Sequence, residues 1–158
     1  METMRIFCKM DSSLSVAIRN GVVVLAPNDP KDPTQHWVKD CYPVRRLTDE
    51  QGQKAFVLMN KAKLQALAVK PSPTSQVSLV GYNGDGTVDL TMVWTEGADV
   101  DDGFREVKWI RDTSKTLNAL NAVKDGTLVG FWPSSPHSAN AIWKMSPHAS
   151  SSSSSCGC

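Results

Sequence analysis

The sequence has no excess of either charge and no long apolar run, and each absence excludes a class of partner. It has 17 lysines and arginines against 16 aspartates and glutamates in 158 residues. A chain with this balance has no general basic surface, so nucleic acid is not an expected partner. No run approaches the ~20 apolar residues of a membrane helix, so no membrane partner is expected. The start of the chain, METMRIFCKMDSS, lacks a hydrophobic signal region, which predicts a cytosolic protein.

Cysteine is scarce, and its placement argues against a disulfide framework. A disulfide-stabilised domain would carry more cysteines than Cys8, Cys41, Cys156 and Cys158, spaced through its body. Cys8 lies in an apolar run and is predicted to be a buried thiol. The last two follow six serines, in a low-complexity tail predicted to be disordered. Two interpretations of this Cys-Gly-Cys stay open: a flexible tail, and a soft-metal or redox-active pair.

Motifs for catalysis, metal binding and cofactor binding are also missing. No serine lies in a nucleophile elbow, and no P-loop or dinucleotide fingerprint occurs. His36, His137 and His148 have no cysteine or carboxylate at metal-ligand spacing. The stretch NGDGTVD (83–89) lacks the helices and terminal glutamate of an EF-hand, so it is interpreted as a turn. We expect no enzyme, cofactor or metal site, although a carboxylate pair for glycoside hydrolysis has no sequence signature that would exclude it.

The chain does contain a series of short β-rich runs. They fall into three sets of four, which close on Trp37, Trp94 and Trp143, and these three tryptophans are assigned to the core. A repeat of about 50 residues built from four strands predicts an all-β fold, the β-trefoil, in which three copies close a barrel capped by three hairpins. The trefoil is expected to span residues 1–148, followed by the tail 149–158. The runs are 4–9, 15–19, 22–26, 36–39, 55–60, 65–69, 76–80, 92–95, 104–110, 116–121, 127–132 and 142–145.

One segment, QKAFVLMNKAKLQALAV (53–69), is also rich in helix formers and by itself fits a helix. Its centre, Asn60-Lys61-Ala62-Lys63, fits a hairpin turn equally well. The grouping in fours favours the hairpin. The first and third copies also align without gaps, VVVLAP (22–27) on LVGFWP (128–133). This alignment places Ala26 where the third copy has Trp132.

Several of these stretches resemble a known family. Gln35-His36-Trp37 is similar to the Q-x-W repeat of ricin-B-type lectins, and GVVVLAPNDPKDPTQHWVKD (21–40), AFVLMNKA (55–62) and VWTEG (93–97) resemble the Euonymus-lectin type domain of plants. The resemblance covers residues 4–146. It implies a carbohydrate-binding protein of the cytoplasm and nucleus, without catalysis, associated with stress responses and binding mannose- or galactose-containing glycans or glycoproteins. A trefoil with one weak site would also gain avidity as a homodimer.

The resemblance also implies where the sugar would bind. In such lectins an aromatic ring stacks on the apolar face of the sugar, and amides or carboxylates bind its hydroxyls. The third copy offers Trp132 as the ring, with Asn121, Asp125 and Asn140 as polar partners. Ser135 stands near the place where the family carries an asparagine.

The third copy departs from the family in two further ways. Asn121 stands for the key aspartate, so charge-assisted hydrogen bonds to hydroxyls are lost, and Ala141 replaces the glutamine of Q-x-W. Trp132 covering a barrel opening and Asn121 capping a turn are the structural alternatives. A trefoil that has lost sugar binding and serves as a protein-interaction module is therefore the alternative function.

Two more groups are considered as secondary sites. Tyr82 and Asn83 lie in the extended loop GYNGDGTVD of the second copy. Gln35 holds the Q-x-W position of the first copy, but Ala26 takes the place of the ring. The Gln35 amide is therefore interpreted as structural, satisfying backbone groups of the proline-rich loop.

Overall fold

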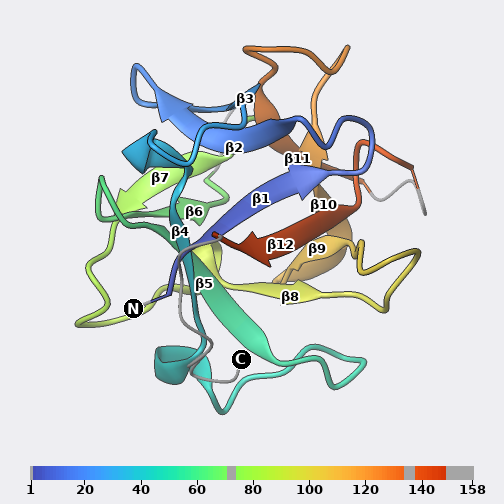
Figure 1. The fold of residues 1–158 in the computed structure, drawn as a ribbon. Helices are drawn as coiled ribbons and strands as arrows, with labels where there is room; N and C mark the ends of the chain where they lie inside the picture. Colours follow the sequence, from blue (N-terminus) through green and yellow to red (C-terminus); the bar gives the residue numbers. More distant parts are fainter. Residues whose placement is uncertain (1, 71–73, 134–137, 149–158) are drawn as a thin grey trace.

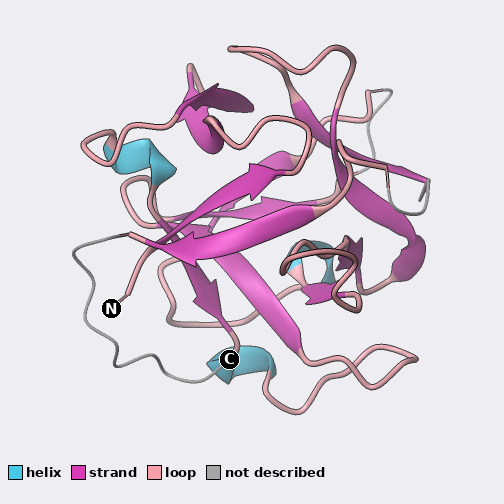
Figure 2. Ribbon diagram, turned by 45° about the vertical axis from the view of Figure 1, so that its right-hand side comes forward, coloured by secondary structure: helices cyan, strands magenta, loops and turns pink. Residues whose placement is uncertain are grey.

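The computed structural model describes residues 2–70, 74–133 and 138–148, in which short strands are joined by long loops and the regular structure is almost all β (Figure 2). The predicted three sets of four strands are confirmed, with single-turn 3₁₀ helices in three connections. None of the helical turns in these residues is long and apolar enough to cross a membrane. The strands are β1 Met4–Cys8, β2 Leu14–Arg19, β3 Val22–Pro27, β4 Trp37–Asp40, β5 Ala55–Asn60, β6 Gln65–Ala68, β7 Ser78–Gly81, β8 Trp94–Glu96, β9 Val107–Trp109, β10 Asp112–Ala119, β11 Val129–Pro133 and β12 Trp143–Pro147; the helices are η1 Pro33–Gln35, η2 Tyr42–Val44 and η3 Leu90–Met92.

Six strands form a closed barrel (Figure 1). The antiparallel pairs run β12–β1–β4–β5–β8–β9. A bridge between Arg105 and Trp143 joins the last strand region to the first, with two backbone hydrogen bonds of 2.7 and 2.8 Å. Closure removes the unpaired edges that would otherwise invite association with other chains.

The other six strands form three hairpins, β2–β3, β6–β7 and β10–β11. The bridges Val24–Leu128 and Gln76–Gly130 connect these hairpins to one another. Their registers correspond: Leu25 lies opposite Val16 as Phe131 lies opposite Leu117. The gapless alignment of the first and third copies is therefore confirmed.

The segment 53–69 forms a hairpin and not a helix. Strands β5 and β6 pair through Met59–Ala66 and Asn60–Gln65. The Asn60 side chain accepts a hydrogen bond from the Lys63 amide, and Leu64 takes a left-handed backbone with φ 52°. Tertiary pairing in the sheet therefore outweighs the helix propensity of this segment.

The three closing tryptophans are the centre of the core. Trp37, Trp94 and Trp143 begin β4, β8 and β12, and each is fully buried. Each indole N–H donates to a backbone carbonyl of the second strand in its own repeat. These bonds run to Val16, Leu67 and Leu117 at 2.9, 3.1 and 2.8 Å. The core assignment of the tryptophans is confirmed, and their hydrogen bonds attach each hairpin to the barrel.

Cys8 lies in the same core and is fully buried, as its apolar neighbours predict. Burial raises the pKa of its thiol, because the charged thiolate is poorly solvated there.

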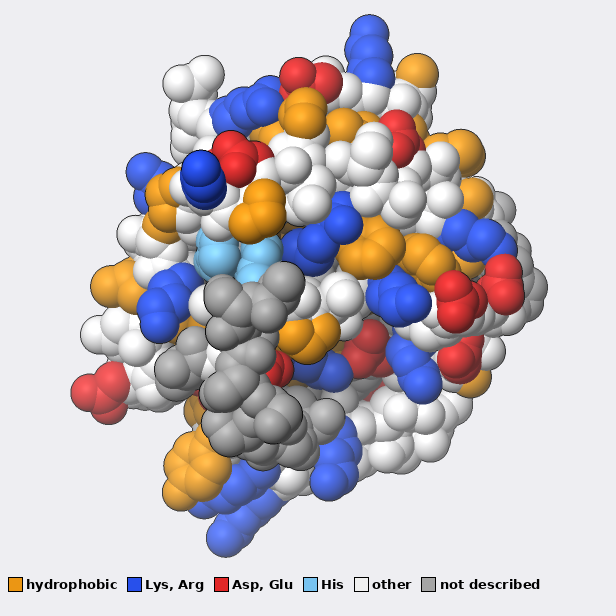
Figure 3. Space-filling view, in the orientation of Figure 1, with side chains coloured by type: hydrophobic (Ala, Val, Ile, Leu, Met, Phe, Trp, Pro, Cys, Tyr) orange, Lys and Arg blue, Asp and Glu red, His pale blue; other side chains and the backbone are white. Residues whose placement is uncertain are grey.

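Two stacked histidines connect the first and last parts of the described chain. The rings of His36 and His148 lie 3.8 Å apart and nearly parallel, and they are adjacent in pale blue in Figure 3. His36 Nε2 lies 2.7 Å from the Pro30 carbonyl, which can only accept, so in the neutral ring Nδ1 accepts from Thr3 Oγ1 at 2.7 Å. Burial, followed by the neighbouring His36 and then Arg5, lowers the pKa of His148, while a bond to the Gln35 carbonyl opposes the shift.

Replacing Trp143 by alanine is expected to cost about 3–5 kcal/mol of unfolding free energy, because it opens a cavity in the core and removes the Leu117 bond. Urea denaturation measures the difference. Trp132→Ala is the matched control, since its exposed ring should change stability by less than about 0.5 kcal/mol. Equal stability of Trp143→Ala and the parent chain would contradict the core assignment.

The stacked histidines predict loss of stability in acid. The folded pKa of His148 is lowered, so below the unfolded value of about 6.5 the unfolded chain takes up the proton more readily. The stability that depends on a neutral His148 is therefore present above about pH 6.5 and declines as the pH falls. Urea midpoints at several pH values measure this slope, and His148→Gln should flatten it between about pH 7.5 and 5.5. An unchanged slope in that variant would assign the acid sensitivity to other groups.

Candidate functional site

One large aromatic side chain stands out on the surface of the cap. Trp132, near the end of β11, is 55% exposed. The hairpin registers place Ala26 and Val80 at the equivalent positions of the other repeats. Only the third of these three positions therefore presents a flat ring on which an apolar ligand face can stack.

Polar side chains share the strand face of Trp132. Thr116 lies directly opposite it in the register, and Asn118 lies two residues farther along β10, so both side chains project to the same side. Asn118 Nδ2 donates to the carbonyl and to the hydroxyl of Thr116, at 2.8 and 3.1 Å. The positions equivalent to Asn118 are Ala17 and Ala68, so this amide too is confined to the third repeat.

The carbonyl oxygen of the Asn118 side chain is available to a ligand. It accepts no hydrogen bond from the described residues, although the residue is only 6% exposed. In the described residues, every side-chain oxygen that is fully buried has a hydrogen-bond partner. The Asn118 oxygen has no partner, so it is not fully buried and reaches solvent. An acceptor beside an exposed indole has the two properties that a sugar site needs. Asn118 was not among the residues expected from the sequence, although the alternation of polar Thr116 and Asn118 in a strand places both side chains on one face.

Asn140 supports this face from the segment before β12. Its Nδ2 donates to the Ala119 carbonyl at 3.0 Å, and its Oδ1 accepts from Ser138 Oγ at 2.5 Å. The Ala119 amide donates to the Asn140 carbonyl at 2.9 Å. Asn140 is thus held against the residue that follows Asn118, with its own amide already engaged.

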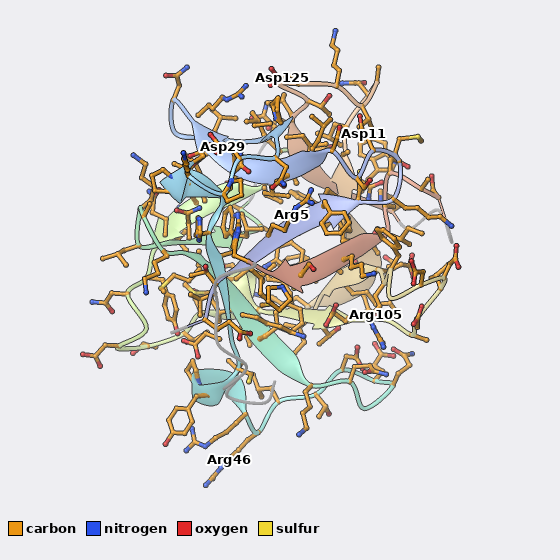
Figure 4. All side chains as sticks on the ribbon, in the orientation of Figure 1. Arg5, Asp11, Asp29, Arg46, Arg105 and Asp125 are labelled. Atoms are coloured by element: carbon orange, nitrogen blue, oxygen red, sulfur yellow. The ribbon has the colours of Figure 1, made fainter. Side chains whose placement is uncertain are left out.

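The structure does not bring the predicted partners Asn121 and Asp125 to Trp132, and that grouping is corrected here. Asn121 lies past the end of β10 in the hairpin turn, exposed and with φ 62°, five residues beyond the position opposite Trp132. That spacing corresponds to roughly 16 Å along a strand. Asp125, at the cap edge in Figure 4, pairs with Arg19 at 2.6 Å. Ser135 lies outside the described residues.

In the first repeat, Gln35 is a structural residue, as interpreted from the sequence. Its side chain is 1% exposed and forms three hydrogen bonds in the proline-rich loop. Nε2 donates to the Pro27 carbonyl at 3.0 Å and to Asp32 Oδ2 at 3.2 Å, while Oε1 accepts from the Asp29 amide at 2.9 Å. Both the nitrogen and the oxygen of this side-chain amide are therefore engaged within the loop.

The strand face of the first repeat is also occupied by another side chain. Ser15 is the equivalent of Thr116, and it accepts a hydrogen bond from Arg5 Nε at 2.9 Å. The Arg5 guanidinium lies 4.1 Å above the ring of Phe7. With Ala26 in the ring position, this repeat lacks both the exposed indole and the open amide.

In the second repeat, the structure does not expose Tyr82 for stacking. The residue is 7% exposed and packs in a hydrophobic cluster. Its hydroxyl donates to Asp40 Oδ2 at 2.6 Å, and burial together with this carboxylate raises its pKa. Asn83 accepts the Asp85 amide within the turn. Tyr82 therefore anchors the loop, and the secondary site considered for these residues is not assembled.

Metal ligands do not gather in the described residues, where no three histidine, cysteine or acidic side chains are arranged to hold an ion.

Comparison with known proteins identifies the family, although no protein-family model matches the chain. Ricin B-like lectin R40G3 of Oryza sativa subsp. japonica is 35% identical over 152 residues, which cover 92% of this chain and 74% of that protein. The chain belongs to the ricin B-like lectins. Ricin B-like lectin R40C1 of the same organism is 38% identical over 151 residues, and this chain, 92% of which is covered, spans 43% of its length. Both relatives are lectins by name, which agrees with the expectation of a chain without enzymatic activity.

Solved structures agree on the fold of this ricin B-like lectin. The designed threefold symmetric protein ThreeFoil has a TM-score of 0.68 at 17% identity, covering 91% of this chain and 97% of ThreeFoil. The Macrolepiota procera ricin B-like lectin in complex with lactose has a TM-score of 0.65 at 14% identity, covering 92% and 94%. At these identities the likeness concerns the fold, and it confirms the β-trefoil.

The role assigned to Gln35 predicts that Gln35→Ala costs about 2–3 kcal/mol of unfolding free energy, because three buried hydrogen bonds are lost. Thermal and urea denaturation measure the cost. Gln51→Ala, which shortens an exposed glutamine, is the control and should stay within about 0.5 kcal/mol. A folded Gln35→Ala protein with full stability but altered glycan binding would instead place Gln35 in a sugar site.

Proposed function

We propose that this ricin B-like lectin binds carbohydrate on the face of the β10–β11 hairpin that carries Trp132. The observation that carries the proposal is the exposed indole on the same face as the open side-chain oxygen of Asn118. The indole would stack on the C–H face of a sugar, and the oxygen would accept a hydrogen bond from a hydroxyl. Asn140 holds the neighbouring backbone in place. Ser135 belongs to the proposed binding set through the family resemblance alone.

The ligands proposed are glycans and glycoproteins that contain galactose or mannose. Each of these sugars presents a patch of C–H groups to a ring and hydroxyls at its edge. The complex of the M. procera lectin with lactose supports a galactose-type ligand. One small, exposed site predicts a dissociation constant on the order of 0.1–1 mM. A homodimer would raise the avidity by presenting two such sites.

The family resemblance further supports a place for the protein in the cytoplasm and nucleus, and a role in stress responses. This location and this role are parts of the proposal. The proposal also includes no nucleic acid or membrane partner, because the charge is balanced and the chain lacks long apolar runs.

Trp132→Ala is expected to weaken glycan binding about tenfold or more, because the stacking surface is lost. A glycan array selects the ligand, and calorimetric titration measures the affinity of the parent chain and of the variant. Leu64→Ala is the matched control, since Leu64 is a comparably exposed apolar residue on the β5–β6 turn. Unchanged affinity in Trp132→Ala would refute the site. Failure of the folded parent chain to bind any glycan would favour the protein-interaction module.

A further inference from the structure

A groove of about 600 Å³ lies away from the Trp132 hairpin, between the segment around η2 and the loop that precedes η3. In Figure 1, η2 lies at the lower left and β11 at the upper right. The groove therefore belongs to the first and second repeats, and Trp132 to the third. Its lining residues are Pro43, Val44, Arg45, Arg46, Leu47, Gly86, Thr87, Val88 and Leu90.

Large apolar side chains are exposed at this groove. Leu47 and Leu90 line it with 37% and 44% of their surface accessible, and Tyr42, next to its lining, is 70% exposed. Figure 3 shows hydrophobic and basic side chains side by side at the lower left of the molecule, where η2 lies. Apolar surface exposed together in a concave place is typical of a ligand site.

The polar side of the groove is basic. Arg45 is held in place, since its guanidinium lies 4.2 Å from the centre of the Tyr42 ring and donates to the Tyr42 carbonyl at 2.9 Å. Arg46 projects away from the barrel in Figure 4 and forms no hydrogen bond or ion pair with the described residues. Arginine pairs with planar anions through two parallel hydrogen bonds, so a free guanidinium beside a fixed one favours a carboxylate or sulfate.

No carboxylate lines the groove to neutralise these arginines. Asp49, the nearest acidic residue after them in the chain, is buried and accepts hydrogen bonds from the Gln51 and Gln53 amides and from Thr95. Asp89, beside the opposite wall, accepts the Thr91 amide, and both it and Asp85 lie outside the lining. The only charged side chains of the lining are those of Arg45 and Arg46, so the lining itself favours an anion.

We propose that this groove is a second saccharide site, selective for an acidic sugar such as a uronate or a sulfated residue. Its acid group would pair with Arg46 and Arg45, and its C–H face would lie on Leu47 and Leu90. The choice of a sugar as the occupant rests on the proposed lectin function, and the choice of an acidic one rests on the charge and lining of the groove. A glycan with a neutral and an acidic residue would then engage one barrel at two places.

The probe is a galacturonate trisaccharide, and its fully methyl-esterified form is the uncharged control ligand. Calorimetric titration of the parent chain should show binding of the acid form that weakens with added salt, and little binding of the ester at this site. The double variant Arg45→Gln/Arg46→Gln should bind the acid form about tenfold or more weakly, since both charge-assisted contacts are removed.

Arg19→Gln is the matched control, an exposed arginine on the cap that is not part of the groove. It should leave binding of the acid probe unchanged, as should Trp132→Ala. Retained acid binding in Trp132→Ala, together with loss of neutral glycan binding, supports two independent sites. Acid binding by a chain that binds no neutral glycan would support the groove and refute the Trp132 site.

Three results would overturn the proposal. The first is equal affinity of the double variant and the parent chain for the acid probe. The second is no binding of the probe by the folded parent chain. The third is displacement of the probe by inorganic phosphate at equal concentration, which would make the groove a simple anion site without recognition of a sugar.

Discussion

Three buried indole hydrogen bonds determine how the hairpins sit on the barrel. Trp37, Trp94 and Trp143 belong to barrel strands, and their acceptor carbonyls belong to the cap hairpins. A buried N–H without a partner would cost about 1–3 kcal/mol, so each hairpin is held at the one register that supplies an acceptor. The exposed face of β10–β11, and with it Trp132, takes its position from the last of these bonds.

The same constraint explains why the proposed sugar site occurs once. Each core position occurs three times, once in each repeat, and the three copies carry similar side chains. Ile6, Leu58 and Val107 are one such set. The hairpin face that carries Trp132 and Asn118 differs among the repeats. An indole and an asparagine stand in the third repeat where the other two have small or aliphatic residues.

The fold could be predicted from the sequence because its period is carried by residues that dominate the core. The site could be predicted only in part. Trp132 is recognisable as an aromatic residue beyond the core pattern, but counting along a loop cannot decide which asparagine shares its face. Asn118 does so because it lies in the strand, and Asn121 does not because the strand has ended. The burial of Tyr82 could not be predicted either, since its hydroxyl bonds to Asp40, which lies 42 residues earlier in the chain.

Net charge also predicts the surface only in part. The balance of acidic and basic residues predicts that no extended basic surface exists, but it does not predict which groups the acidic side chains contact. Asp89 and Asp112 accept hydrogen bonds from residues two positions further along the chain, and these bonds lower the pKa of each carboxyl. Burial opposes the shift at Asp49, but hydrogen bonds from Thr95, Gln53 and Gln51 lower the pKa of its carboxyl. No described carboxylate forms an ion pair with Arg46 at the groove. A nearly neutral chain can therefore keep a local positive site where its acidic side chains are engaged elsewhere, as Asp49 is by Thr95 and the turn amides.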